Sequence, residues 1–423
     1  MRRKCASRAA LRRARERRRQ RRRLARRPSA MVRALTAAAL ALPGLASPAA
    51  ADSPPTQARS DYHYSRYAED AVESKKVAAG SERDRYEIDI HQFRFETGIS
   101  DRVGFNIDIT HEAMSGATPW YVTPGPNGTP VQVMTQATIE EARTDALLAG
   151  DYYFDRGKAT LSGGVSSEND YLAFNGGLGG ERQFNDKNTT LSAGIGASFD
   201  RITPEDTNKY PTRPHRENKQ TYDVYLAASQ VLGSATIVQT SVKYQLGTGY
   251  LSDPYKLAYV AGTPETDERP DLRNQISWLT RFRHHFRSAK ASVHLDYMLY
   301  ADDWKMYSHT FELAWYQTLF DRFLLVPSAR YYSQSQAEFY APYFTAPRGD
   351  GYRSSDYRLS PYGAYAFGIK AELPFEVWSL NWALTAAYDR YVSGADLALQ
   401  KVDVENPGLV SYNLFTVGVT GRF

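Results

Sequence analysis

The chain has almost no cysteine. Its single cysteine, Cys5, lies in an arginine-rich N-terminal segment, and none follows. This excludes disulfide-stapled scaffolds, thiolate metal sites and cysteine nucleophiles from the rest of the protein. The sequence also has no uninterrupted apolar run of about 18 residues, so a helical membrane protein is excluded. Long amphipathic helical patterns are missing after residue 52.

The basic charge is concentrated at the start of the chain. Residues 1–30 contain fourteen arginines and one lysine against one glutamate, a net charge of +14. Arg33 adds one more positive charge, so residues 1–51 carry +15. The whole chain has a formal net charge of +5, and residues 52–423 therefore carry −10. Arginine tracts can neutralise nucleic-acid phosphates, but this tract has no interleaved aromatic residues and directly precedes an export signal. We therefore expect residues 1–30 to be a leader or a misassigned start outside the fold, and we expect no nucleic-acid partner.

Residues 31–51 have the three parts of a secretory signal peptide. Met31 and Arg33 form a short basic start, residues 34–46 are apolar, and small residues precede Asp52. The apolar stretch is too short for a hydrocarbon core of about 30 Å, so a retained anchor is not expected. We predict cleavage after Ala51 and export of the remaining chain.

The exported chain is dominated by two-residue alternation. Apolar residues occupy every second position in residues 103–109, 191–199, 291–299 and 378–388, mostly with polar or small residues between them. A period of two is typical of β-strands with one apolar and one polar face. The sequence therefore predicts an all-β protein.

Short and long connections alternate along the whole chain. Short turn signals lie near residues 101, 156, 186, 233, 288, 321 and 374, and longer connections cover roughly residues 70–83, 113–140, 166–171, 204–219, 250–272, 301–305, 340–355 and 393–408. Seven short and eight long connections give sixteen strands, the first near Tyr62–Glu69 and the last at Val410–Phe423. This alternation predicts a transmembrane antiparallel up-and-down β-barrel of about 16 strands, with short periplasmic turns and long outer loops. We assign residues 52–60 to a short periplasmic segment and 61–423 to a barrel in the outer membrane of a Gram-negative bacterium.

The C-terminus carries a separate signal. Phe415, Val417, Val419, Gly421 and Phe423 occupy alternate positions, and the chain ends on the last of them. This pattern resembles the terminal strand of Gram-negative outer-membrane proteins, which the barrel-assembly machinery reads. An amphipathic strand of this kind can pair with an exposed sheet edge before the barrel closes. We therefore expect that machinery to be a partner during biogenesis.

Several local strings point to a family. They are Met114-Ser115-Gly116-Ala117-Thr118-Pro119, Glu141-Ala142-Arg143-Thr144, Ser167-Glu168-Asn169-Asp170-Tyr171, Asn185-Asp186-Lys187-Asn188-Thr189-Thr190-Leu191 and Asp200-Arg201-Ile202-Thr203-Pro204. Over roughly residues 60–423 the chain resembles an uncharacterised Gram-negative family catalogued as domain of unknown function 3570. The resemblance implies an outer-membrane barrel with no established activity, substrate or binding residues.

The polar faces of the strands are candidates for the barrel interior. In a barrel of this size the exterior meets lipid and the interior meets water, which inverts the rule for soluble proteins. The predicted lumen-lining residues are Asn106, Asp108, Thr110, Glu112, Ser292, His294, Asp296, Asn381, Thr385 and Asp389. The net charge of −10 indicates a pore biased toward cations, or bridging to lipopolysaccharide through divalent ions; solvated loop surface is the alternative. The long connection 113–140, which is rich in proline, is a candidate for an inward-folding constriction.

The sequence offers little catalytic chemistry. His284 and His285 are adjacent on an expected strand, so they point to opposite faces and do not suit one metal ion. A Gly-x-Ser-x-Gly motif is absent, and the glycine run 176–180 is not followed by the Lys-Ser/Thr of a phosphate loop. We expect no catalytic, metal or cofactor site.

Three functions fit these observations. The first is a passive pore, or the barrel component of an envelope transport system, that contacts outer-membrane lipid, lipopolysaccharide and small solutes or ions. The second is a loop-plugged barrel with a structural or partner-docking role, for example in a redox-linked envelope complex; a haem-attachment Cys-x-x-Cys-His motif is absent, so a redox cofactor would belong to the partner. The third, carrying least weight, is an outer-membrane hydrolase, because Ser–His pairs form in space and not in sequence.

Overall fold

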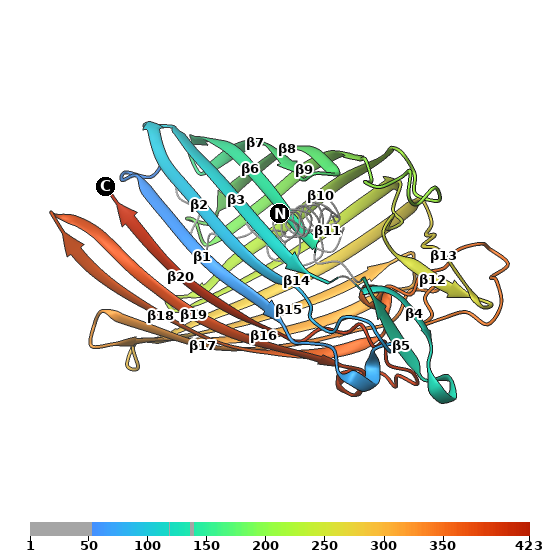
Figure 1. Ribbon diagram of the computed structural model, residues 1–423. Helices are drawn as coiled ribbons and strands as arrows, with labels where there is room; N and C mark the ends of the chain where they lie inside the picture. The colour runs from blue at the N-terminus through green and yellow to red at the C-terminus, as the bar shows by residue number, and fades with distance from the viewer. Residues whose placement is uncertain (1–52, 118, 136–138) are drawn as a thin grey trace, which may run out of the picture.

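Sixteen antiparallel strands form one closed barrel (Figure 1). The computed structural model describes residues 53–117, 119–135 and 139–423, so the predicted leader and signal peptide lie outside the described residues. The predicted fold class, a transmembrane up-and-down barrel with sixteen strands, is confirmed.

Each barrel strand pairs with its neighbour along the chain. The strands are β1 (Arg59–Glu69), β2 (Glu87–Ser100), β3 (Val103–Gly116), β6 (Ile139–Phe154), β7 (Gly157–Ser167), β8 (Tyr171–Phe184), β9 (Thr189–Ile202), β10 (Glu217–Gly233), β11 (Thr236–Gly249), β14 (Leu272–Phe286), β15 (Ala291–Asp302), β16 (Tyr307–Leu319), β17 (Phe323–Gln334), β18 (Tyr362–Val377), β19 (Leu380–Gly394) and β20 (Tyr412–Arg422).

Two small hairpins and four short helical turns complete the described secondary structure. The hairpins are β4 (Pro119–Pro124) with β5 (Pro130–Met134), and β12 (Leu257–Val260) with β13 (Thr263–Thr266). The 3₁₀ turns are η2 (Ser74–Lys76), η3 (Pro126–Gly128), η4 (Tyr357–Leu359) and η5 (Ala395–Leu397). None of the helices in the described chain has the length and apolar character needed to cross a membrane.

The first and last strands close the barrel. β1 pairs with β20 in unbroken register, from Arg59 opposite Arg422 to Glu69 opposite Tyr412. The backbone N–H and C=O groups at both edges of the sheet are therefore hydrogen-bonded. Strands in lipid require this, because no water is present there to bond them. β1 begins and β20 ends at the same end of the barrel as the short turns, which we call the turn end; the longer connections lie at the opposite, loop end (Figure 1).

The expected turn near residue 374 is misplaced. β18 continues through Pro374 to Val377, and the turn is formed by Trp378 and Ser379, both with positive φ (51° and 63°). A two-residue loop with positive φ at both positions matches the right-handed twist of a hairpin. Trp-Ser is an unusual pair for this turn, and the proline nearby is the stronger local signal, so the sequence favours the wrong position.

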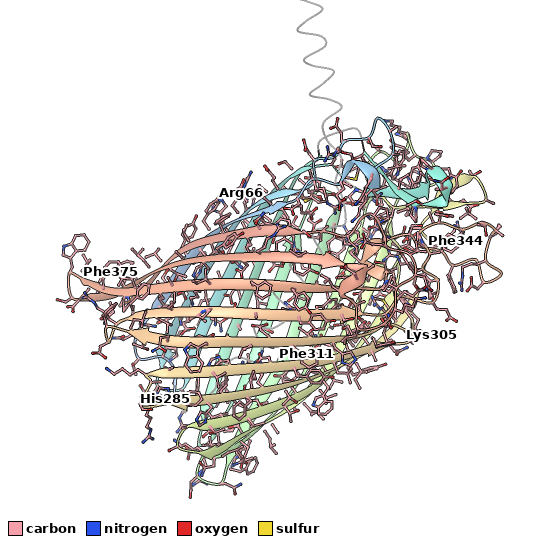
Figure 2. The ribbon with its side chains drawn as sticks, turned by 90° about the horizontal axis from the view of Figure 1, so that it is seen from below. Arg66, His285, Lys305, Phe311, Phe344 and Phe375 are labelled. Atoms are coloured by element: carbon pink, nitrogen blue, oxygen red, sulfur yellow. The ribbon has the colours of Figure 1, made fainter. Side chains whose placement is uncertain are left out.

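Large apolar side chains cover the outside of the barrel. Leu161, Ile195 and Leu226 are 68%, 60% and 63% exposed, and Phe311 is among the exposed aromatic side chains of the wall (Figure 2). In water such a surface would favour aggregation, because removing apolar area from water lowers the free energy by about 25 cal/mol per Å². Facing acyl chains, it is the surface that a lipid-embedded barrel requires.

Candidate functional site

The interior of the barrel contains a cavity of about 880 Å³. Residues from β2 through β14 border it, together with Ser53, Pro54, Pro55 and Thr56 of the N-terminal segment. Among the described residues, its charged lining consists of five carboxylates and three basic side chains: Glu96, Asp108, Asp151, Glu181, Asp223, Arg94, Lys158 and Arg281. The inside of the barrel is therefore polar where the outside is apolar.

Several of these charges form ion pairs between neighbouring strands. Arg94 lies 3.3 Å from Asp108, Lys158 lies 3.5 Å from Asp151, and on the same wall Arg281 lies 3.5 Å from Asp296. Pairs of opposite sign across a ladder fix the side chains while leaving a wettable surface. Such a surface suits water and small hydrophilic solutes.

The ten predicted lumen residues occupy different parts of the wall. Asn106 and Asp108 border the cavity, whereas the other eight do not. Thr110 and Glu112 follow on β3 toward the loop end and are buried. Ser292, His294 and Asp296 lie on β15, where Asp296 pairs with Arg281 and Arg283. Asn381, Thr385 and Asp389 lie on β19, away from the cavity.

One outer connection, residues 335–361, enters the mouth at the loop end. Its Tyr357 packs in an apolar cluster with Tyr67 of β1 and Met114 of β3. Met114 lies on the same face of β3 as Asn106 and Asp108, which border the cavity. Tyr67 lies on the face of β1 opposite to Tyr62, whose side chain is 42% exposed, so both partners of Tyr357 point inward.

The same connection also reaches the opposite wall. Its Phe339 and Leu359 pack with Trp304 and Met306 of the β15–β16 connection, against Tyr300 of β15. A single segment therefore spans the mouth from β1–β3 to β15–β16 and covers it.

The expectation that residues 113–140 form the constriction is wrong. Most of that connection folds into the β4–β5 hairpin, which projects from the loop end (Figure 1). Paired backbone and the glycine-containing turn η3 give the hairpin its own hydrogen bonds, so it needs no contact with the lumen. The proline content indicated a long connection between barrel strands but not the direction in which that connection folds.

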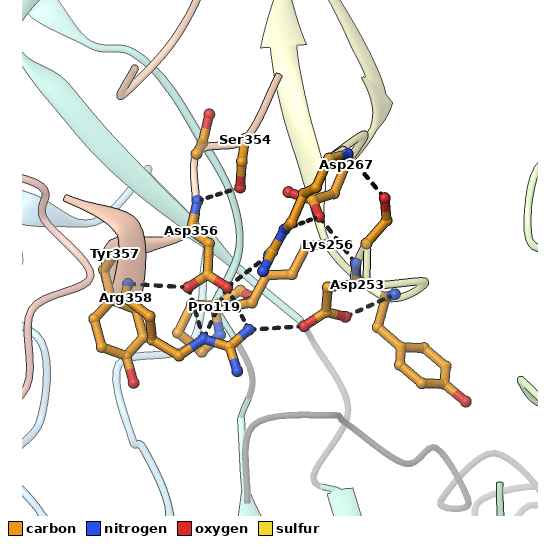
Figure 3. Close-up of polar contacts among 12 residues, drawn as sticks. Pro119, Asp253, Lys256, Asp267, Ser354, Asp356, Tyr357 and Arg358 are labelled. Atoms are coloured by element: carbon orange, nitrogen blue, oxygen red, sulfur yellow. Dashed lines mark hydrogen bonds and ion pairs between the residues drawn. The ribbon is translucent and has the colours of Figure 1, made fainter. Parts of the chain in front are cut away.

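A buried charge network holds the covering segment in place (Figure 3). Asp356 accepts hydrogen bonds from Arg269 at 2.9 Å and from Nε of Arg358 at 2.8 Å. Arg358 also donates to Asp253 at 2.9 Å, and Arg269 donates to Asp267 at 2.6 Å. The network joins residues 250–271 to residues 335–361; we call this joined structure the loop cap.

Burial and charge set the ionisation of this network. Burial alone would raise the pKa of Asp356, but the positive charges of Arg358, Lys256 and Arg269 outweigh it and hold that pKa well below its usual range. Burial lowers the pKa of Lys256, whose ammonium donates to the carbonyl of Pro119 at 3.0 Å. Asp356 thus stays ionised as the anchor of the loop cap.

The family comparison agrees with this architecture. The family described as "Protein of unknown function (DUF3570)" matches residues 32–404. The chain belongs to this family. A search of curated proteins finds no match to the sequence.

Solved structures similar to this family member are outer-membrane barrels. They include a bacterial polysaccharide outer membrane secretin (9% identity, 86% of this chain and 98% of that chain, TM-score 0.45). A FadL homologue of Pseudomonas aeruginosa has 10% identity over 86% of this chain and 89% of that one, with a TM-score of 0.37. OccD3 (OpdP) of the same organism has 10% identity over 92% and 97%, with a TM-score of 0.41. At these identities the likeness concerns the barrel fold alone.

A second, smaller hollow lies among the outer connections of this family member. It measures about 320 Å³ and is bordered by Trp120, Tyr210 and Tyr255 among others. The guanidinium of Arg213 stands over the rings of Tyr210 and Tyr255, with its carbon 4.1 and 4.7 Å from the two ring centres. Stacking of this kind helps to hold the wall of the hollow in place.

Sequence reasoning missed one constellation. Glu141, Glu168 and Asp170 converge near the loop end, although the expectation was that no metal site exists. Glu141 comes from β6 and the other two come from the β7–β8 connection, so no local sequence motif predicts that they meet. Only strand register brings them together.

Proposed function

We propose that this protein is an outer-membrane channel for small hydrophilic solutes or ions, with an outer mouth controlled by the loop cap. The observation that carries the proposal is the polar cavity of about 880 Å³ inside an apolar-coated, closed barrel. A channel needs a wettable interior and a lipid-compatible exterior, and the chain provides both. The excess of carboxylates among the cavity's charges favours cations.

The loop cap supports a gated channel over a wide-open one. Residues 335–361 contact both walls of the mouth, so free passage at the loop end requires that this segment moves. The network around Asp356 joins the segment to residues 250–271, and the two connections would therefore move together.

Conductance in a planar lipid bilayer tests the proposal. The wild-type protein should give small or intermittent single-channel currents. A variant with residues 337–360 replaced by a short Gly-Ser linker should give larger and steadier currents, because the barrel strands are untouched and the side chains that cover the mouth, Phe339, Tyr357 and Leu359, are removed. Retention of the barrel is checked by far-ultraviolet circular dichroism.

The second candidate is a plugged barrel that docks a partner, and the same loop cap favours it. If the folded, loop-shortened variant carries no steady current, the channel proposal fails and the plugged barrel is the better description. We propose solute passage rather than catalysis, because charged groups that line the cavity form ion pairs along the wall. Outer-membrane lipid and lipopolysaccharide are the proposed surroundings, and the barrel-assembly machinery is the proposed partner during insertion.

A further inference from the structure

Three carboxylates from two separate segments meet at one point inside the loop end. One oxygen each of Glu141, Glu168 and Asp170 lies within 4.8 Å of the others. Glu141 and Asp170 are only 5% and 1% exposed, and the side chain of Glu168 is 1% exposed. Three negative charges are thus gathered where bulk water screens them little.

A fourth carboxylate adds an independent observation. Glu112 is 2% exposed, and neither of its carboxylate oxygens has a hydrogen-bond partner among the residues that the structure describes. Burying a carboxylate without hydrogen bonds has a large free-energy cost. A carboxylate in this state therefore indicates a ligand that would bind it.

Strand register aims Glu112 into the same cluster. On the β3–β6 ladder Glu112 stands opposite Arg143, and Met114, two residues further on β3, stands opposite Glu141. Nε of Arg143 in turn lies 3.7 Å from Glu168. Glu112, Arg143 and Glu168 therefore lie side by side on the inner wall, with Glu141 directly beside them.

Arg143 stands beside these acids with a single positive charge. Arg143 lies 3.7 Å from Glu168 and also 3.7 Å from Asp145, so its single charge is shared. Like carboxylates this close cannot all remain ionised unless a cation joins them.

The surrounding contacts hold the carboxylates in position. The hydroxyl of Tyr255 donates to Asp170 at 2.5 Å. The backbone carbonyl of Asp170 accepts from the amide of Thr203 at 2.7 Å, and the amide of Glu168 donates to the carbonyl of Tyr171 at 2.7 Å. The β7–β8 connection is thus fixed before any ligand arrives, which reduces the entropy lost on binding.

We propose that Glu141, Glu168 and Asp170, with Glu112 beside them, form a binding site for a divalent cation of the calcium class. The three converging donors and the neighbouring Glu112 are all carboxylates, the ligands that hard cations prefer, whereas zinc sites use histidine or thiolate. Calcium accepts six to eight oxygens in an irregular arrangement, and a pocket assembled from two strands and a loop supplies such an arrangement more readily than the octahedron that magnesium demands. The cation would clamp β3, β6 and the β7–β8 connection together and, through Tyr255, the outer connection 250–271.

Terbium luminescence on the refolded protein in detergent tests the site directly. Tb³⁺ replaces Ca²⁺ at oxygen sites, and Tyr255 next to Asp170 can transfer excitation energy to it. We expect saturable luminescence that Ca²⁺ displaces with an affinity of about 10⁻⁴–10⁻³ M, the range of extracellular calcium modules, and that Mg²⁺ displaces more weakly.

Two isosteric variants and a matched control complete the experiment. Glu168→Gln and Asp170→Asn should each weaken Tb³⁺ binding at least about tenfold, which is about 1.4 kcal/mol. Asp223→Asn, which removes another interior acid, on β10, should bind as the wild type does. Circular dichroism establishes that each variant is folded. Absence of saturable luminescence in the wild type, or unchanged binding in the folded Asp170→Asn variant, would overturn the proposal; neither outcome bears on solute conductance.

Discussion

Asp356 accepts a hydrogen bond from Arg269 across a distance of 2.9 Å, and this contact joins two outer connections that lie 87 residues apart in the sequence. Both side chains are largely buried: Asp356 has no exposed side-chain area and Arg269 has 10%. A buried ion pair of this kind is costly to break from one side, because the remaining charge loses its partner without regaining water.

Replacing Asp356 with asparagine should loosen the loop cap while leaving the barrel folded. The substitution removes the negative charge that Arg269, Arg358 and Lys256 share, and we expect a destabilisation of the cap of about 3–5 kcal/mol. Limited proteolysis of the two connections measures this. Asp350→Asn, which affects an exposed pair with Arg348 in the same connection, is the control and should change cleavage little.

The loop cap should tolerate mild acid and fail only in strong acid. The pKa of Asp356 is depressed in the folded protein, so its stabilising contribution is complete above its unfolded pKa of about 3.9 and is lost as the pH falls through the folded value. Burial raises the pKa of Asp267, so the stability contributed by its protonation increases as the pH falls and partly offsets the loss. Protease susceptibility measured from pH 7 downward should stay constant to about pH 4; opening near pH 6 would contradict this account.

Removing a cavity carboxylate should reduce cation preference. Asp108 borders the interior cavity beside Arg94, so Asp108→Asn leaves one more net positive charge on the lining. The reversal potential in a KCl gradient should shift in the direction that reports a lower preference for K⁺ over Cl⁻. Asp403→Asn removes the same charge from an exposed loop pair with Lys401 and should leave the potential unchanged. Equal potentials for wild type and Asp108→Asn would contradict a pathway along this wall.

Adding one methyl group at Gly363 should disturb the loop end. A Cβ there would collide with the backbone carbonyl of Leu397 in η5, and backbone cannot yield as a side-chain tip can. We expect Gly363→Ala to cost about 1–3 kcal/mol, the usual range for overpacking. Denaturant unfolding in detergent micelles measures the loss. Gly150→Ala, where a Cβ meets no atom within 4 Å, should cost much less.

Truncation of the last side chain should reduce assembly more than stability. The ring of Phe423 meets that of Trp382 edge-on with centres 5.7 Å apart, yet it is 47% exposed, so few native contacts depend on it. Phe423→Ala should therefore lower the amount of folded barrel in cells, while protein refolded in detergent keeps nearly its wild-type stability. A parallel loss in both measurements would assign Phe423 a packing role.

Much of the barrel could be predicted because its rules are local. Alternation such as Val103 to Ile109 sets the two faces of a strand, and the spacing of turn residues sets the number of strands. Both signals are read within about ten residues, so sixteen strands and an apolar exterior were predictable. The turn at Trp378 and Ser379 could not be predicted in this way, because it needs positive φ values that these two residue types rarely adopt.

By itself, then, the sequence determined the kind of surface each strand presents: period-two patterning commits every strand to one apolar and one polar face, whatever its neighbours are. Only the tertiary structure decided what fills the mouth and where charges meet. The packing of Tyr357 against Met114 and the convergence of Glu141 on Asp170 arise from register and loop direction. Those depend on pairings between residues far apart in the chain, which no local pattern encodes.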